Sequence, residues 1–372
     1  MNRLTVRAHD ARVDLKKENI TRILLVRGLF RLGDAILATP TISLMHHNFP
    51  KAEIDFVGPS ITTNLFNNLP INRYYEIDRS FPRACWFYPT LLKRLRRRKY
   101  DLALDTSGSS AALGSFIVGF SGARFRVGIK GKWDRWFNVR VDRSPSPNKY
   151  KNLPELFGSL RLKSAKVRPS ITLTAMETDA GRKRVEALTG NSEKPIVGIF
   201  VGGRKSRGKR WPIENFVKLV TLLRTDGMRP IVFAGPEETD SLVYLRFVLG
   251  HRVPVVFEPD ITSFAALVAN CDLFVTCDSG PLHLACALGV RTVAIFLKYN
   301  FDRWGPPPDL ASIVFRESGV EVENVIEACR TELRAICKER VAGKIMNIKS
   351  WSRNRGHRSN AASAENSGSG VS

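Results

Sequence analysis

The stretch Cys277-Asp278-Ser279-Gly280-Pro281-Leu282-His283-Leu284-Ala285 joins an apolar run, residues 272–276, to a segment of small residues, 286–289. We expect a buried strand that leads through Asp-Ser-Gly-Pro into a helix. Pro281 suits the first helical turn, where its missing N–H is not needed, and His283 lies in the same turn. A helix N-terminus carries unpaired N–H groups and a partial positive charge, so it suits a phosphate or diphosphate. The stretch therefore predicts a ligand-binding loop of an α/β protein.

Strand-like apolar runs alternate with helical patterns along the chain, which is typical of parallel sheets covered by helices. In the first half we expect strands at residues 23–27, 53–57, 74–77 and 101–105, and helices near 39–48, 89–98 and 110–119. In the second half we expect strands at 196–201, 230–234, 254–257, 273–276 and 292–296, and helices near 213–224, 237–249, 263–270 and 281–288. A segment with Pro and Asn, 142–151, interrupts this rhythm, and a polar stretch, 177–194, precedes the second set. The pattern predicts an α/β fold of two doubly wound domains that face each other across a cleft.

The chain of 372 residues is long enough for two domains that each bury a core. We expect a first domain over residues 21–180, a second over 190–318 and an amphipathic C-terminal helix within 319–350. Residues 1–20 lack strong periodicity, and residues 351–372 are rich in Ser, Gly, Asn and Ala. Both ends are therefore predicted to be mobile.

The N-terminal sequence, the apolar runs and the cysteines indicate the cellular compartment of the protein. The charged N-terminus lacks the apolar core of a signal peptide, and the longest apolar run, 111–120, is too short to cross a bilayer. The six cysteines form no CxxC pair and most have apolar neighbours, so we expect reduced core residues. Packing is favoured over a nucleophilic role for Cys277, which has no assigned base partner. The sequence predicts a cytoplasmic protein that attaches to a membrane at most peripherally.

The net charge of +23 predicts an anionic partner. The basic residues gather in three clusters: Lys93, Arg94, Arg96, Arg97, Arg98 and Lys99; Arg124, Arg126, Lys130, Lys132, Arg135 and Arg140; and Arg204, Lys205, Arg207, Lys209 and Arg210. Nucleic acid, anionic lipid headgroups and an acidic or phosphorylated substrate all fit these clusters. The first cluster also fits a solvated helix face, because leucines accompany it at helical spacing.

The first of four polar or glycine-bearing loops after predicted strands spans residues 27–34 and ends in Gly33-Asp34. A glycine lets the backbone turn sharply and aims the Asp34 carboxylate off the strand end. Asp34 could deprotonate a substrate hydroxyl there, or it could cap the helix that follows. The loop is not a GxGxxG dinucleotide motif, because Phe30 stands in place of the middle glycine.

The second loop, residues 201–212, is rich in glycine and in basic residues: Gly202, Gly203, Arg204, Lys205, Arg207, Lys209 and Arg210. Such a loop can wrap a diphosphate and neutralise a departing phosphate. It lacks the GxxxxGK[ST] order of an NTPase P-loop. A contact with nucleic acid is the alternative interpretation.

The third loop holds Glu237, which could accept hydrogen bonds from ribose hydroxyls or favour the start of a helix. The fourth is the Asp278–Ser279–Gly280 loop described above. A lone histidine is usually structural, but the place of His283 in a first helical turn favours a functional role. The chain contains no DxD, G-x-S-x-G or HExxH motif, so cationic side chains and helix dipoles would have to do the work of a metal that bridges a diphosphate.

Three segments resemble the lipopolysaccharide heptosyltransferase family, glycosyltransferase family 9. They are ILLVR (23–27) with LGDAILATP (32–40) and FPKAEID (49–55), then KRWP (209–212) with ENF (214–216), and DSGPLHLA (278–285). They occur in the family's order and at comparable spacing. The resemblance implies a GT-B fold of two facing Rossmann-like domains, with the acceptor bound mainly by the first and the nucleotide sugar by the second.

The resemblance also implies an inverting, metal-independent transfer of a sugar from a nucleotide sugar, with ADP-heptose expected, to a lipopolysaccharide core or another lipid-linked glycan. Asp34 would be the base, Lys209 would contact the donor diphosphate, and Glu237 would hold the ribose. Further donor contacts would come from Gly202, Gly203, Arg204, Arg207, Asp278, Ser279, Gly280 and His283, and acceptor contacts from Arg27, Arg31 and Gly33. No cofactor or metal is expected. The implied partners are the nucleotide sugar, the anionic acceptor and the inner face of the inner membrane.

Three alternatives stay open at this point. A nucleic-acid-binding α/β protein is favoured by aromatic residues among basic ones, as at Trp133, Trp136 and Phe137. A transferase of another sugar would share the same loops. An inactive member would bind a nucleotide sugar without transfer, but the presence of Asp34 argues against it. The paired loops at strand ends in both halves favour the enzyme, and a nucleic-acid partner is not expected.

Overall fold

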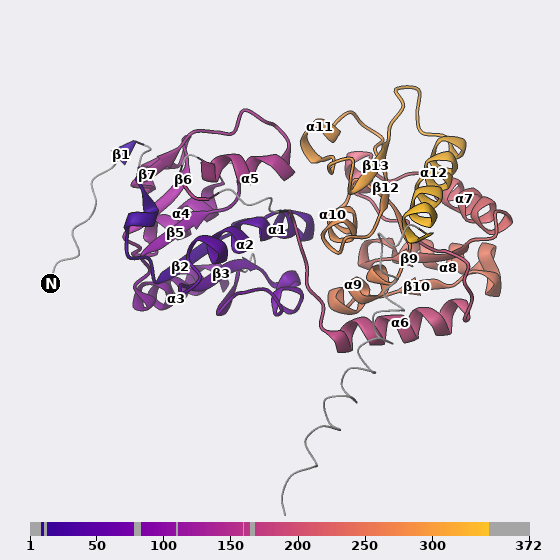
Figure 1. The fold of residues 1–372 in the computed structure, drawn as a ribbon, viewed down its shortest axis with the longest axis horizontal. Helices are drawn as coiled ribbons and strands as arrows, with labels where there is room; N and C mark the ends of the chain where they lie inside the picture. The colour runs from indigo at the N-terminus through magenta and orange to yellow at the C-terminus, as the bar shows by residue number, and fades with distance from the viewer. Residues whose placement is uncertain are drawn as a thin grey trace, which may run out of the picture.

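The computed structural model describes residues 9–10, 13–77, 83–108, 111–158, 160–163 and 168–341. These residues form two α/β domains that lie side by side, each built on a twisted parallel sheet with helices on both faces (Figure 1). The expected two-domain α/β fold with a cleft between the domains is confirmed.

The first domain has a seven-stranded sheet in the order β1-β7-β6-β5-β2-β3-β4, with parallel pairing throughout. Its strands are β1 (His9–Asp10), β2 (Arg22–Val26), β3 (Glu53–Pro59), β4 (Arg73–Ile77), β5 (Leu102–Asp105), β6 (Phe125–Ile129) and β7 (Val139–Val141). Its helices are α1 (Leu32–Ile36), α2 (Thr39–Asn48), α3 (Arg83–Arg98), α4 (Ala112–Phe120) and α5 (Lys149–Gly158). The apolar residues of β2 are fully buried, as expected for a central strand covered on both faces.

The second domain has a six-stranded parallel sheet in the order β10-β9-β8-β11-β12-β13. Its strands are β8 (Ile196–Phe200), β9 (Arg229–Ala234), β10 (Val255–Phe257), β11 (Leu273–Cys277), β12 (Thr292–Ile295) and β13 (Ala311–Val314). Its helices are α6 (Ala175–Thr189), α7 (Ile213–Thr225), α8 (Thr239–Leu249), α9 (Ile261–Ala269), α10 (Gly280–Ala287), α11 (Phe301–Trp304) and α12 (Val322–Val341).

The strand order places the four predicted loops at the edge of each sheet where ligands bind. In the first domain the chain order reverses between β2 and β5, and in the second between β8 and β11. Doubly wound sheets bind ligands outside the carboxyl ends of strands at such switch points. The loops after β2, β8 and β11 all leave from a switch point, and the loop after β9 leaves from the neighbouring strand.

Four of the described strands and four of the described helices were not predicted: β1, β6, β7 and β13, and α1, α5, α6 and α11. Strands β6 and β7 carry Arg126 and Arg140 within short sequences, so they lack the continuous apolar run of a buried strand, while β1 and β13 are short strands at sheet edges. The polar stretch 177–194 is largely helix α6, which begins with a capping box between Thr174 and Glu177. Helix α5 begins inside the segment 142–151, which was interpreted only as a break.

The structure also differs from the expected domain limits. Helix α6 packs on α9 of the second domain, where Gly181 approaches the Ala266 carbonyl so closely that a Cβ would lie 2.4 Å from it. The chain crosses between the domains just before α6, because the Ser170 N–H bonds to Thr39 Oγ1 and the Ile171 N–H to the Ala287 carbonyl, both at 3.0 Å. The first domain therefore ends before residue 175.

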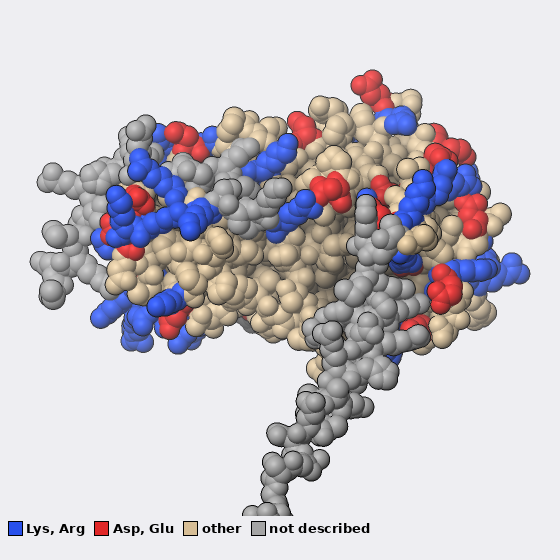
Figure 2. Space-filling view, in the orientation of Figure 1, with Lys and Arg blue, Asp and Glu red and all other residues tan. Residues whose placement is uncertain are grey.

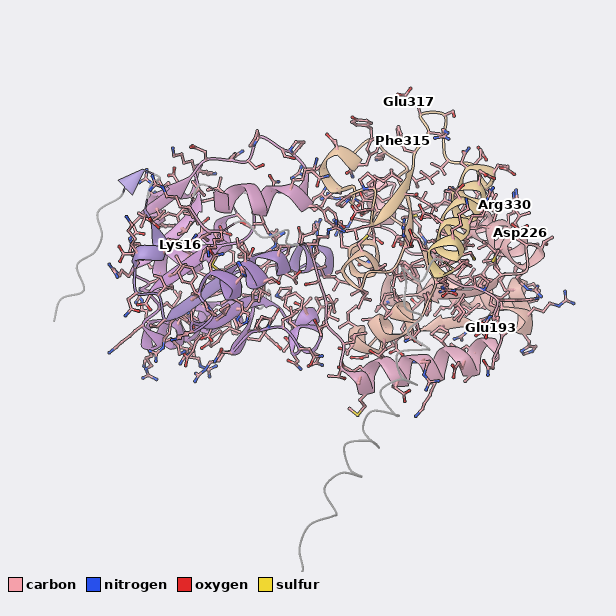
Figure 3. The ribbon with its side chains drawn as sticks, in the orientation of Figure 1. Lys16, Glu193, Asp226, Phe315, Glu317 and Arg330 are labelled. Atoms are coloured by element: carbon pink, nitrogen blue, oxygen red, sulfur yellow. The ribbon has the colours of Figure 1, made fainter. Side chains whose placement is uncertain are left out.

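The two chain ends are only partly described. Within the expected mobile arm, residues 13–20 pack against the first domain, since Leu15 is fully buried in its core, so that part of the expectation is wrong. Residues 1–8 and 11–12 lie outside the described residues, as does everything after Val341, including the expected tail 351–372. Helix α12 is held to the second domain by a two-bond ion pair of Arg330 with Asp226, at 2.8 and 3.1 Å (Figure 3).

Candidate active site

A cavity of about 410 Å³ lies between the two domains at the carboxyl ends of their strands. Its wall contains nearly all the predicted site residues: Arg31, Gly33 and Asp34 from the first domain, and Gly203, Arg204, Arg207, Lys209, Glu237, Asp278, Ser279, Gly280 and His283 from the second. Gly202 and Arg27 do not line it. The fold thus brings together loops that are up to about 250 residues apart in sequence, as the doubly wound topology requires.

Asp34 lies in α1 and is 8% exposed at the cavity wall. It does not cap the helix: the cap residue Arg31 makes no side-chain cap bond, and Asp34 instead accepts a hydrogen bond from Arg27 Nη2 at 3.1 Å. This hydrogen bond orients the Asp34 carboxylate at the cavity wall. The geometry fits a base aimed at a substrate hydroxyl better than a helix cap.

Arg27 was predicted to contact the acceptor but lies behind Asp34, 2% exposed. It donates to the Thr106 carbonyl as well as to Asp34, and Nε is buried with no hydrogen-bond partner among the described residues. Burial lowers the pKa of Arg27, while Asp34 and Asp105 oppose that shift. Arg27 therefore acts as a buried counter-ion between two carboxylates.

Asp105 ends β5 beside this pair and was missed by sequence reasoning. Its carboxylate accepts hydrogen bonds from the Ser107 N–H at 2.9 Å and from the Ser107 and Ser115 hydroxyls at 2.5 and 3.1 Å. Burial raises the pKa of Asp105, and the Ser107 and Ser115 bonds and Arg27 oppose the shift. Glycine at position 114 is required for this packing, since a Cβ there would lie 2.9 Å from the carboxylate.

On the opposite wall, Lys209 forms an ion pair with Asp278. Asn300 also donates to Asp278, at 2.8 Å, and the pair is shielded, with Asp278 9% exposed. Ser279 is the N-cap of α10, and its hydroxyl lies 3.2 Å from that of Thr276. A cationic Lys209 thus stands next to the N–H groups of the first turn of α10, an arrangement that favours a phosphate group.

The Gly-rich loop is positioned by Glu238, a residue that sequence reasoning passed over in favour of its neighbour. Glu238 is 3% exposed, accepts the Gly235 N–H at 3.0 Å, and has its pKa raised chiefly by burial. A Cβ on Gly202 would lie 2.6 Å from the Glu238 carboxylate, so Gly202 is needed for packing beneath the cavity. Glu237 is the exposed residue of the two and faces the cavity.

His283 connects the two domains. It is 4% exposed, and its Nδ1 lies 2.6 Å from the hydroxyl of Tyr150 in α5 of the first domain. Burial lowers the pKa of His283 to about 4, so the ring is neutral near pH 7. A Cβ on Gly33 would lie 2.5 Å from the ring carbon Cδ2. The base loop and the donor-side loop therefore touch directly at Gly33 and His283.

Lys149 begins α5 and adds positive charge on the Asp34 side of the site. Burial, then Arg27 and Arg303, lower the pKa of Lys149 to about 8, and Asp34 opposes the shift. Its Nζ donates to the Gly108 carbonyl at 3.3 Å. No local sequence signal marked this residue, because the position depends on how the loop before α5 folds back over the strand ends.

Most of the remaining cavity wall is apolar and was not predicted, although Glu238 and Glu258 also line it. Its apolar lining includes Phe30, Phe200, Pro259, Ile261, Phe264 and Trp304. Burial raises the pKa of Cys277 to about 12, which supports the packing role. Among the side chains that the structure describes, no group of three or more His, Cys, Asp or Glu residues is arranged to hold a metal ion.

Comparison with known proteins agrees with this geometry. Residues 89–332, more than half of the chain, match the sequence model of glycosyltransferase family 9 (heptosyltransferase). Lipooligosaccharide heptosyltransferase 2 of Haemophilus ducreyi is 23% identical over 286 residues, which cover 71% of this chain and 80% of that protein.

Solved structures show the same fold. A family 9 glycosyltransferase from Veillonella parvula superposes with a TM-score of 0.74 at 19% identity, covering 85% of this chain and 97% of that one. Heptosyltransferase WaaC of E. coli, solved with ADP-2-deoxy-2-fluoro heptose, gives a TM-score of 0.66 at 16% identity, covering 85% and 99%. Taken with the family match and the two-domain cleft, these findings show that the chain belongs to glycosyltransferase family 9, the heptosyltransferases.

Proposed function

We propose that this chain transfers heptose from ADP-heptose to an anionic, lipid-linked oligosaccharide of the lipopolysaccharide core, with inversion at the anomeric carbon. One observation carries the proposal: Asp34 of the first domain and the Lys209–Asp278 pair of the second face one cavity, and Gly33 contacts His283 between them. The family match and the names of the relatives support heptose, and a relative of the same fold was solved with an ADP-heptose analogue.

In the proposed reaction Asp34 removes the proton from the acceptor hydroxyl as its oxygen attacks the anomeric carbon. The bond from that carbon to the diphosphate oxygen breaks on the opposite face, so the configuration inverts. Arg27 fixes the orientation of Asp34 from behind and keeps a compensating charge beside it. Holding both substrates across the cleft supplies much of the remaining acceleration.

The leaving nucleoside diphosphate gains negative charge as the bond breaks. Lys209, Arg204 and Arg207 line the cavity together with the first residues of α10. Their positive charge and the N–H groups of that first turn would stabilise the developing charge. In the free enzyme Asp278 partners Lys209, so the diphosphate would take over part of that interaction. These cations are the basis for proposing a transfer without a metal ion.

Glu237 and the apolar wall define a place for the nucleoside. A carboxylate at the end of β9 can accept hydrogen bonds from the ribose hydroxyls. Phe200, Ile261 and Phe264 line the same cavity and would offer an apolar surface to a nucleobase. The acceptor would enter along Arg31 and Lys149, whose charges suit an anionic oligosaccharide.

Where the enzyme works is also a proposal. Within the described part of the chain, no helix combines the length and the apolar composition that a membrane span needs. An acceptor anchored in a bilayer would nevertheless have to be reached from the surface of that bilayer. We infer a cytoplasmic enzyme that works at the inner face of the inner membrane.

The experiment is a thermal-shift panel of ADP-, GDP-, UDP- and CMP-linked sugars in the presence of EDTA, followed by transfer assays with the donor that binds. Ligand at about 100 times its Kd should stabilise the protein by about 2.7 kcal/mol. A selective shift with ADP-heptose and transfer to a delipidated core acceptor would support the proposal. A selective shift with another nucleotide sugar would identify that compound as the donor in place of ADP-heptose. Loss of donor binding in the presence of EDTA would contradict a metal-independent transfer.

A further inference from the structure

Helix α3 presents an exposed stripe that is aromatic at one end and basic at the other. Trp86 is 82% exposed, and Thr90, Lys93 and Arg97 follow it at helical spacing on the same exposed face. Helix α3 contains no Asp or Glu. The 16 residues of α3 extend over about 24 Å, so the stripe is long enough to lie along a surface.

The basic residues of α3 are of two kinds, one that forms ion pairs within the domain and others that are exposed. Arg98 turns inward to Glu53 and Asp55, at 2.5 and 3.1 Å, and is a structural residue. Lys93 and Arg97 are exposed instead. Lys and Arg side chains gather on this end of the molecule, at the lower left of the space-filling view (Figure 2). The exposed cations are therefore not accounted for by the packing of the domain.

An aromatic cluster adjoins α3 on the same layer of the first domain. Phe116 and Phe120 of α4 contact Trp136, at ring distances of 5.9 and 6.0 Å, and Trp136 stacks on Trp133 at 5.3 Å. Lys132 and Arg135 lie over these two indole rings at 5.2 and 5.4 Å. Arg96 of α3 donates to the Phe120 carbonyl at 2.9 Å, which joins the two elements directly. Exposed cations and half-buried aromatic rings thus form one continuous layer.

This layer also reaches the active site. Phe30 lines the cavity and packs against the same apolar cluster as Leu91 of α3 and Ile117 of α4. Phe87 and Tyr88, next to Trp86, are partly buried against that cluster as well. A substrate that entered from a surface lying on α3 would meet the first domain beside the loop that carries Asp34.

We propose that the α3 stripe, Trp86, Lys93 and Arg97 with Lys132 and Arg135 beside it, is the surface by which this enzyme docks on an anionic lipid bilayer. The inference rests on the proposed function, because a lipid-linked acceptor makes the bilayer the anionic surface that the first domain must approach. An amphipathic helix with aromatic and basic residues binds at the headgroup level. Charge complementarity with anionic headgroups and continuity with the cavity select this occupant.

A second exposed apolar face serves as the internal control. Phe247 of α8 is 85% exposed and Val243 is 78% exposed, but α8 belongs to the second domain and is remote from α3 (Figure 1). Phe247→Ser therefore matches Trp86→Ser in exposure without touching the proposed surface. Lys218→Glu with Lys338→Glu, both exposed on the second domain, matches Lys93→Glu with Arg97→Glu in charge.

The test is co-sedimentation of the full-length protein with vesicles of phosphatidylcholine alone or mixed in equal parts with phosphatidylglycerol. Each basic residue near an anionic surface contributes about 1 kcal/mol to binding, which is about a fivefold change in the partition coefficient. The double variant Lys93→Glu/Arg97→Glu removes two such charges, so it should weaken partitioning onto anionic vesicles at least about 25-fold. Trp86→Ser should weaken it severalfold, and both control variants should bind like the wild type. Transfer to a vesicle-embedded acceptor should fall in parallel, while transfer to a delipidated acceptor should not change.

Equal losses in the α3 and control variants, or no binding of the wild type to anionic vesicles, would overturn the docking proposal. Salt-sensitive binding of DNA or RNA that is lost with the same α3 variants, without vesicle binding, would assign the surface to nucleic acid. Vesicle binding through α3 without transfer from any donor would leave docking standing and refute the proposed function. Normal transfer on vesicles by the α3 variants would refute the docking proposal and leave the proposed function standing.

Discussion

Replacing Gly33 with alanine should disable the enzyme by pushing the two domains apart. The added Cβ would lie 2.5 Å from His283 Cδ2, whereas two carbon atoms pack at about 3.5–4.0 Å. His283 is held by Tyr150 at 2.6 Å and is 4% exposed, so the ring has little room to give way. The loop or the domain must therefore move by about 1 Å, and a misplacement of that size can cost about 100-fold in rate, or about 2.7 kcal/mol.

The assay is steady-state transfer with both substrates varied. We expect kcat of Gly33→Ala to fall about 100-fold, with the melting temperature close to that of the wild type, because alanine favours helix α1. A double-mutant cycle with His283→Ala checks the cause. If the clash is responsible, adding Gly33→Ala to His283→Ala should have little further effect on kcat.

Two outcomes would refute this reasoning. A kcat of Gly33→Ala within a few-fold of the wild-type value would mean that the contact between the base loop and α10 is not maintained in the working enzyme. A full 100-fold loss that persisted when His283→Ala was already present would assign the effect to the Gly33 backbone itself. Such a result would remove the interdomain contact from the mechanism.

Four further variants test the site. Asp34→Asn should lower kcat at least about 100-fold, the contribution of a general base, while calorimetry finds donor affinity unchanged; turnover within a few-fold of wild type would remove Asp34 as the base. Lys209→Ala should weaken donor binding or slow transfer by roughly 10-fold or more, since it removes a charged hydrogen bond, and unaltered donor Kd and rate would contradict its role. Arg27→Met should lower the free energy of unfolding by about 3–5 kcal/mol in urea titrations, because it leaves Asp34 and Asp105 without their buried counter-ion; an unchanged midpoint would argue against it. Lys149→Met should raise the melting temperature at neutral pH, and the gain should shrink as the pH rises above about 8. Above about pH 8 the unfolded wild-type chain still binds the Lys149 proton and the folded chain does not, so the stability of the wild type rises with pH. An increase in melting temperature that did not depend on pH would contradict the burial of a charged Lys149.

Much of the site could be predicted because its signals are local. Gly33-Asp34 and the Asp278-Ser279-Gly280 loop each follow a short apolar run bounded by turn residues, which is typical of a buried strand, so the sequence places both loops after a strand. The confirmed fold class rests on the same alternation of runs. The roles given to Asp34 and Lys209 stay predictions that the variants above will test, and the role given to Glu237 also stays a prediction.

Other features were hidden because they depend on contacts between distant segments. Tyr150 and His283 are 133 residues apart and meet only because two sheets face each other. Arg27 was assigned to the acceptor, but the folding of β5 beside β2 places Asp105 near it and turns it into a buried counter-ion. Glu238 was passed over for Glu237 because adjacent carboxylates look alike until one is buried against Gly202 and Gly235.

By itself the sequence determined that this chain forms two parallel-sheet domains with polar loops at their strand ends, because hydrophobic period and turn residues act over a few positions. Only the tertiary structure decided which residues line the cavity and which support it from behind. That choice depends on burial and on distances between segments far apart in the chain. Arg27 and Lys149 illustrate the difference: both are basic residues near loops in the sequence, and only the fold buries one behind Asp34 and lowers the pKa of the other.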